Sequence, residues 1–106
     1  QVNHISVEEI KEQPNAVVGK FLINAFIALV LFDTGASHSF ISRGFVDKFK
    51  LPTVALKSPM LVSSPGAEYM ASRGCFQLPL TTGRHVFPTD LIILESQGLD
   101  VILGMD

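Results

Sequence analysis

The sequence is poor in charge, has one cysteine and contains no long apolar run. Charged residues make up 17% of the 106 positions, and the formal net charge is −2. Lysine and arginine form no cluster, which argues against a nucleic-acid partner, because proteins bind the phosphate backbone through concentrated positive charge. Cys75 has no second cysteine for an internal disulfide, which fits a reducing compartment such as the cytoplasm.

Signals for a membrane or a metal are also missing. The longest uninterrupted apolar run, residues 25–32, is far shorter than the roughly 20 residues of a membrane-spanning helix, and no signal segment opens the chain. We therefore expect a soluble protein without a membrane partner. The three histidines, His4, His38 and His85, lack the spacing of zinc ligands, so no metal ion or other cofactor is expected.

Apolar residues, by contrast, make up 47% of the chain. The length predicts one domain with one core. Because a small domain has much surface to cover, we expect some apolar surface to contact a partner chain or an apolar ligand. Residues 1–15 are the most polar stretch and are interpreted as an N-terminal arm, in which Ser6 and Glu9 form a capping-box pattern for a short helix over residues 7–12. The domain proper is expected over residues 16–106.

Two short apolar runs, residues 17–23 and 26–32, predict a β-hairpin that turns at Asn24 and Ala25. A helix is the alternative, which Gly19 and Asn24 make less favourable. After residue 35, Ser39 is expected to cap a short helix that carries Ile41, Phe45 and Phe49. From residue 54 onward, apolar stretches alternate with turn signals at residues 64–66, 74, 82–83 and 97–98, which is typical of an antiparallel all-β domain.

The chemistry centres on Asp33, which follows the second apolar run directly. Thr34 adds a hydroxyl and Gly35 leaves bare backbone, so the three residues suit the activation of a water molecule. The alternative is an ordinary turn that caps the next helix, and the tripeptide alone cannot decide because it is common by chance.

The context of this tripeptide is more specific. An apolar strand, the segment Asp33-Thr-Gly-Ala-Ser37, a short helix, a turn through residues 64–66 and the final Val101-Ile-Leu-Gly104 together resemble the retropepsins, in particular the proteases of Ty3/gypsy-type retrotransposons. The resemblance runs from about residue 17 to the end. It implies an all-β, small, closed, barrel-like fold with one short helix, acting as a homodimer.

The resemblance also implies a role for individual residues. Asp33 would be catalytic, and Thr34 would tie the two active-site loops of a dimer together. The active-site loop would continue through Gly35, Ala36 and Ser37. The segment behind the loop would be Ile102, Leu103 and Gly104. A flap over the substrate would span residues 61–70, with Val62, Ser63, Ser64, Pro65 and Gly66 around its turn.

Two features depart from the retroviral pattern. Ser37 and Met105 stand where retroviral enzymes commonly have an acidic residue and an arginine that pair with each other. Because both partners are absent together, no charge is orphaned, and we expect a subfamily variation. The chain also ends at Asp106, where the family continues with more of a helix; either the sequence is trimmed or its dimer is held differently.

Other candidate catalytic groups are weaker. Cys75 could act as a nucleophile with a histidine base, but it lies in a probable strand, and a buried, inert thiol is the preferred interpretation. His38 could perturb Asp33, although a solvent-exposed place at the helix entry is preferred. Asp90 and Asp100 are not followed by Thr-Gly or Ser-Gly, and are interpreted as turn or strand-end residues.

With one catalytic aspartate per chain, the proton-sharing pair of an aspartic protease needs two copies of the chain. The expected substrate is an extended peptide under the flap, and the resemblance implies a retrotransposon polyprotein processed in the cytoplasm or in retrotransposon particles. Two alternatives remain open. One is a non-catalytic dimerisation or peptide-binding module with the same fold, and the other is an unrelated β domain in which Asp33 lies in a surface turn.

Overall fold

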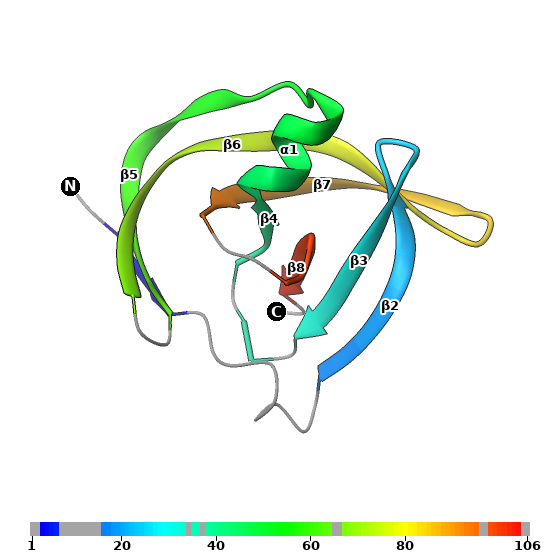
Figure 1. The fold of residues 1–106 in the computed structure, drawn as a ribbon, viewed down its shortest axis with the longest axis horizontal. Coiled ribbons are helices and arrows are strands. Elements are labelled where there is room, and N and C mark those ends of the chain that lie inside the picture. The colour runs from blue at the N-terminus through cyan, green and yellow to red at the C-terminus, as the bar shows by residue number, and fades with distance from the viewer. Residues whose placement is uncertain are drawn as a thin grey trace.

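The computed structural model describes residues 3–6, 16–33, 35–36, 38–64, 67–95 and 98–104. The helix predicted over residues 7–12 lies outside these ranges. Within them the chain forms eight strands and one helix (Figure 1). They are β1 (Asn3–Ser6), β2 (Ala16–Ile23), β3 (Phe26–Asp33), β4 (Phe40–Ser42), α1 (Arg43–Phe49), β5 (Val54–Ser64), β6 (Ala67–Thr82), β7 (His85–Leu94) and β8 (Val101–Gly104).

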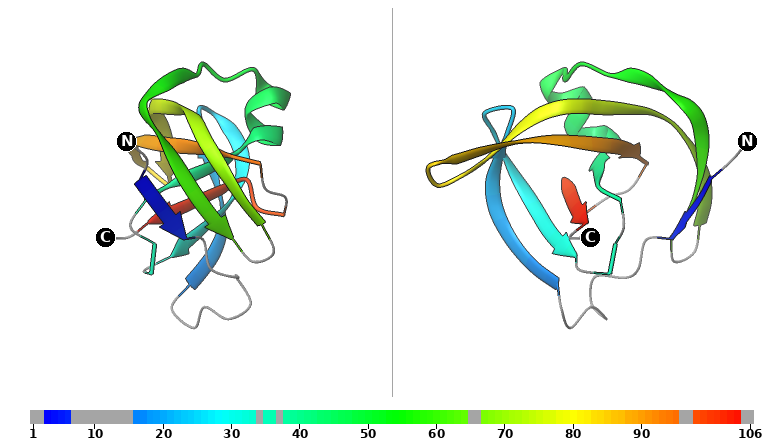
Figure 2. Two further views of the ribbon diagram at one scale, coloured as in Figure 1. Left: turned by 90° about the vertical axis from the view of Figure 1, so that its left-hand side faces the viewer. Right: turned by 180° about the vertical axis from the view of Figure 1, so that it is seen from behind.

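Six of the strands close into a barrel. Their order is β6-β2-β3-β8-β4-β7, and β7 pairs again with β6. The predicted all-β fold with one short helix is thereby confirmed. The remaining strands extend the sheet beyond the barrel: β5 pairs with the first half of β6 as a long hairpin, and β1 pairs with the outer edge of β5 (Figure 2).

The β2–β3 hairpin turns where the sequence predicted. Asn24 and Ala25 both have positive φ, 50° and 71°, which is the backbone of a two-residue hairpin turn whose twist matches that of the strands. The Asn24 N–H donates a hydrogen bond to the Pro79 carbonyl oxygen of β6 at 2.8 Å. In β3, Val30 and Leu31 are both buried although they point to opposite faces, so this strand is covered on both sides at its centre.

The helix begins three residues later than predicted, and its cap is Ser42 rather than Ser39. Ser42 Oγ accepts a hydrogen bond from the Phe45 N–H at 3.1 Å. Ile41, expected on the helix, lies instead in the three-residue strand β4, which pairs with β7 on one side and with β8 on the other. Pairing with two neighbours outweighs the weak local preference for helix at these positions.

Gly74, predicted to lie in a turn, is in the middle of the 16-residue strand β6. It is opposite Val54 of the β5–β6 hairpin on one side and Ile92 of the barrel on the other. A Cβ at Gly74 would lie 2.9 Å from the Leu91 carbonyl oxygen. The glycine thus permits close backbone contact where β6 passes from the hairpin to the barrel, and it does not end the strand.

A bulge in β6 explains the position of Asp90. Gln77 has a φ of 57° where the β6–β7 register shifts. Its backbone N–H donates to Asp90 Oδ1 at 2.9 Å, and its side-chain amide donates to the same oxygen at 3.2 Å. Asp90 therefore lies inside β7, and its interpretation as a turn or strand-end residue is wrong, because the carboxylate satisfies the bulged backbone.

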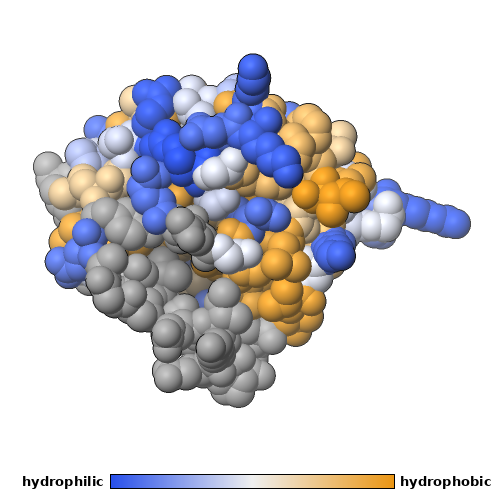
Figure 3. Space-filling model, viewed as in Figure 1, coloured by the Kyte–Doolittle hydropathy of each residue, from blue (hydrophilic) through white to orange (hydrophobic). Residues whose placement is uncertain are grey.

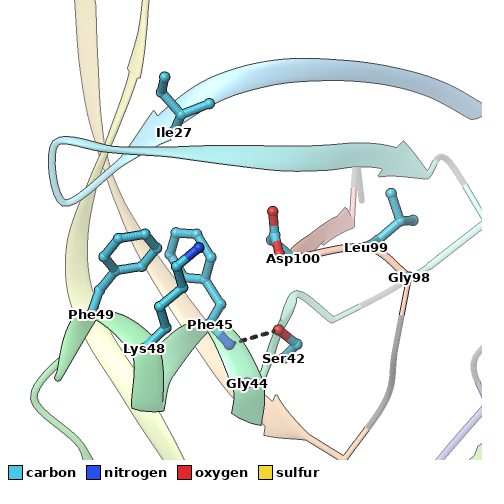
Figure 4. Close-up of a pocket in the computed structure, with 9 residues that line it drawn as sticks. All are labelled: Ile27, Ser42, Gly44, Phe45, Lys48, Phe49, Gly98, Leu99 and Asp100. Carbon is cyan, nitrogen blue, oxygen red and sulfur yellow. Dashed lines mark hydrogen bonds between the residues drawn. The ribbon is translucent and has the colours of Figure 1, made fainter.

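Asp100 directly precedes β8, in agreement with its interpretation as a turn or strand-end residue. Its backbone N–H donates to the Leu29 carbonyl at 3.1 Å, and its Oδ2 accepts from the Leu29 N–H at 2.8 Å. Its own carbonyl accepts from the Ser42 N–H at 2.8 Å. Figure 4 shows it beside a pocket of about 260 Å³ that α1, β3 and the segment before β8 enclose. The carboxylate thus binds β3 and the backbone carbonyl binds β4, so Asp100 has a structural role.

The buried apolar side chains form two clusters. The larger fills the barrel and includes Val30, Ile41, Phe45 and Cys75. The second, which we call the flap-side cluster, joins the barrel to the β5–β6 hairpin; it comprises Leu31, Phe40, Val62, Ala71, Ile92, Leu94 and Ile102. In the described part of the chain, no helix is long and apolar enough to cross a bilayer.

Candidate active site

Asp33 is the last residue of β3 and is only 4% exposed. Its backbone lies between Ala16 of β2 and Gly104 of β8, so a strand flanks it on each side. It is the one buried carboxylate among the described residues. Burial of a charge is costly unless the group is paired, hydrogen-bonded or protonated. Asp33 is therefore not part of an ordinary surface turn, in which its carboxylate would be exposed to solvent.

The chain turns immediately after Asp33. The Gly35 N–H donates to Asp33 Oδ1 at 2.8 Å, and the Ala36 N–H donates to the Asp33 carbonyl at 3.2 Å. One carboxylate oxygen is thus oriented by the backbone of its own loop. Thr34 and Ser37, the other predicted loop residues, lie outside the described residues, as does Met105.

The segment Ile102–Leu103–Gly104 lies beside the loop as predicted. Its three residues pair in parallel with Leu31, Phe32 and Asp33. A Cβ on Gly104 would lie 2.6 Å from the Ala36 carbonyl oxygen and 2.8 Å from that of His38. The Gly104 N–H donates to Ser39 Oγ at 3.0 Å. Ser39 therefore connects β8 to the active-site loop, which is the role that replaces its predicted helix cap.

We predict that Gly104→Ala is strongly damaging. The new methyl group would meet backbone oxygen rather than a movable side chain, so we expect a loss of about 1–3 kcal/mol in the free energy of unfolding. Displacement of residues 36–38 should also reduce peptide cleavage. Urea denaturation and a cleavage assay would measure both effects.

Gly44→Ala is the matched control. A Cβ there has no atom within 4 Å, and Gly44 lies in α1, so this variant should gain about 0.5–1 kcal/mol. Equal stability of the two variants would show that the close contact between Gly104 and the Ala36 carbonyl does not constrain residue 104 to glycine.

A groove of about 800 Å³ runs from Gly104, the residue that pairs with Asp33, to the base of the β5–β6 hairpin. Gly104, His38 and Ser39 lie at its loop end, and the hairpin contributes residues 54–58 and Met60. Phe76, Asp90 and Ile92 complete the lining. Such a groove, open along its length and lined largely by apolar side chains, is suited to an extended chain.

The predicted flap corresponds to the end of the β5–β6 hairpin. Val62 is buried in the flap-side cluster, Ser63 Oγ donates to Glu68 at 3.1 Å across the hairpin, and Ser64 pairs with Ala67. Pro65 and Gly66 lie outside the described residues.

The sequence did not predict the groove lining, because residues 54–60 and 90–92 come together only through the pairings of β6.

His38 is half-buried and precedes β4, so its predicted place at an exposed helix entry is wrong. The helix starts only after β4, and His38 instead contributes to the groove lining beside Gly104. No group of three or more potential metal ligands occurs in the ranges that the structure describes.

Cys75 is fully buried in β6, as predicted, and burial raises the pKa of its thiol. A thiol that is buried and protonated is a poor nucleophile. We predict that a disulfide reagent at pH 8 modifies Cys75 at least about 100-fold more slowly in the native protein than in urea, because local unfolding must expose the sulfur first. Rapid modification of the native protein with loss of activity would instead support cysteine chemistry.

Comparisons with known proteins agree with this arrangement. The family model described as "Retroviral aspartyl protease" matches residues 1–106. Nine chains of solved structures match, among them the EIAV protease complexed with the inhibitor HBY-793, at 17% identity and a TM-score of 0.66. That match covers 88% of this chain and 85% of the EIAV chain, and it establishes a shared retropepsin-like fold. No curated protein matched. With its full length matched by the family model, the chain belongs to the retroviral aspartyl protease family.

Proposed function

We propose that this protein is an aspartic endopeptidase in which Asp33 is the catalytic residue. The observation that carries the proposal is the buried Asp33 carboxylate, which the Gly35 N–H orients. Asp33 pairs with Gly104, which lines a groove that suits an extended peptide. Membership of the retroviral aspartyl protease family supports it. No metal or organic cofactor takes part in the proposed reaction.

The proposed active form is a homodimer. Aspartic-protease chemistry requires two carboxylates that share one proton, and each chain supplies one Asp33. A two-fold axis beside Asp33 would bring the two copies together. Exposed apolar side chains support a contact there: Val17 and Val18 are 64% and 48% exposed on β2, next to the residue that pairs with Asp33. Figure 3 shows apolar atoms gathered on this side of the molecule.

In the proposed mechanism, the ionised member of the pair takes a proton from a water molecule that attacks the peptide carbonyl. The protonated member donates a hydrogen bond to the carbonyl oxygen, and proton transfer to the leaving nitrogen then completes cleavage. The Gly35 N–H fixes Asp33 Oδ1, so the carboxylate is oriented before substrate arrives.

The proposed substrate is an extended polypeptide held as an additional strand between the flap and the groove. The groove contributes Leu56, Met60, Phe76 and Ile92, so apolar side chains should be favoured in the cleaved segment. We propose that the natural substrate is the polyprotein of a Ty3/gypsy-type retrotransposon, cleaved in the cytoplasm or within retrotransposon particles.

A peptide-library cleavage assay with a statine-type inhibitor tests the function. The hydroxyl of the inhibitor imitates the tetrahedral carbon formed by water attack, so it should compete with substrate. Cleavage should be fastest at mildly acidic pH, where the pair holds one proton, and should decline on the alkaline side. Cleavage that resists the inhibitor and rises steadily to about pH 9 would contradict an aspartic mechanism.

A further inference from the structure

The β5 strand of the flap has a neighbour on each of its two edges. Residues Met60–Ser63 pair antiparallel with residues 68–71 of β6 on one side. On the other side the same four residues pair in parallel with Asn3–Ser6 of β1. A strand has only two edges on which it can form a ladder. The β1 strand therefore occupies the one edge of β5 that β6 leaves open (Figure 2).

This open edge is the place at which an extended peptide would join the flap. Peptides commonly bind to a sheet by adding a strand to an exposed edge, where main-chain hydrogen bonds hold them. Met60, which pairs with Asn3, also lines the groove that ends at Gly104 beside Asp33. The β1 strand and a substrate would thus require the same main-chain groups of β5.

We propose that Asn3–Ser6 binds within its own chain at the substrate edge of the flap and competes with substrate. This inference rests on the proposed function of the groove and flap. The effect is an intrachain inhibition that any chain carrying the N-terminal segment would experience, and an extended peptide of sufficient affinity would displace it.

The size of the contact suits a displaceable inhibitor. Four residues in a parallel ladder bind weakly by themselves, and parallel pairing is the less stable kind. The tether compensates, since residues 7–15 join β1 to β2 and a short tether gives an effective concentration in the millimolar range. The apparent affinity for substrate is then reduced by the fraction of chains whose flap edge is open.

Two proline variants of the full chain test the inference. Alternate residues of a strand direct their N–H groups to the same neighbour, so only one of His4 and Ile5 can donate to β5. Proline removes that N–H but is compatible with an extended backbone. Of His4→Pro and Ile5→Pro, one should therefore release β1 and the other should serve as its matched control.

For the releasing variant we expect KM to fall about three- to tenfold with kcat unchanged. A synthetic peptide of residues 1–8, added in trans, should restore the higher KM, and the same peptide with N-methylated backbone should not. Amide exchange at Met60–Ser63 should become faster in this variant alone. If KM is unchanged or rises in both variants, β1 does not compete with substrate and serves only to brace the flap.

A binding measurement separates this inference from the proposed function. A fluorescein-labelled statine-type peptide should bind the releasing variant about three- to tenfold more tightly than the wild-type chain, by fluorescence anisotropy. If no form of the protein cleaves peptides but the affinity increases as expected, the proposed function fails and the competition at the flap stands. If cleavage is normal and the affinity is equal in all forms, only the competition is disproved.

Discussion

Asp33→Asn is expected to abolish peptide cleavage and leave the barrel folded. The amide has nearly the shape of the carboxylate, and its oxygen can still accept the hydrogen bond from the Gly35 N–H. It cannot hold or release the shared proton, so the rate should fall by about a thousandfold or more. Steady-state kinetics of the purified variant, together with its far-UV circular dichroism and melting temperature, would separate lost chemistry from lost structure.

Asp47→Asn is the control for this substitution. It makes the same chemical change at an exposed position of α1, away from the groove, and should leave the cleavage rate unchanged. Near-wild-type cleavage by the Asp33→Asn variant would refute the assignment of Asp33. An unfolded variant would show instead that the carboxylate is required for the β3–β8 junction, and Asp33→Glu, which keeps the acid, would then decide whether chemistry is also lost.

The second large effect concerns the dimer. If each chain supplies half of the catalytic pair, activity per chain must fall when the protein is diluted below its dimer dissociation constant. A tenfold excess of Asp33→Asn chain should reduce the activity of the wild-type chain to about a tenth, because nearly every wild-type chain then pairs with an inactive partner. Measuring activity against concentration, alongside sedimentation, would test both expectations.

A single chain could also be sufficient by itself. In that case activity per chain would stay constant on dilution while sedimentation showed only monomer, and the excess of mutant chain would have no effect. A second acid of the same chain, such as Asp90 or Asp100, would then have to complete the site. The symmetric mechanism predicts the opposite of all three observations.

The amino-acid sequence determined the features that depend on neighbouring residues. Two short apolar runs that are rich in β-branched or aromatic residues and divided at Asn24 predict the first hairpin. The positive φ angles of Asn24 and Ala25 confirm the two-residue turn. The place of Asp33 at the end of a buried strand, and the burial of Cys75, follow from the same local patterns. Only the family resemblance predicts that Ile102–Leu103–Gly104 lies beside the loop, and in the structure this segment pairs with Leu31–Asp33 of β3.

Other features were decided by contacts between segments far apart in the chain. The local sequence favours Ser39 as the helix cap, but the pairing of β4 with β7 and β8 takes residues 40–42 into a strand, and Ser42 caps the helix instead. The local sequence around Gly74 predicts a turn, but β6 continues through Gly74 because it pairs there with both β5 and β7. Local secondary-structure propensity does not depend on residues far apart in the sequence, so it cannot predict such pairings.

The groove and the pairing of β1 with the edge of β5 also depend on the tertiary structure. The groove combines residues from the segment before β4 with residues of β5, β6, β7 and β8, and β1 pairs with β5 across more than fifty residues of sequence. A polar N-terminal segment carries no local sign of the strand it will join, since pairing partners are selected by which edges remain open after the barrel closes. Local sequence thus determined where Asp33 lies, and only the closed barrel decided what surrounds it, because its strand pairings bring distant residues together.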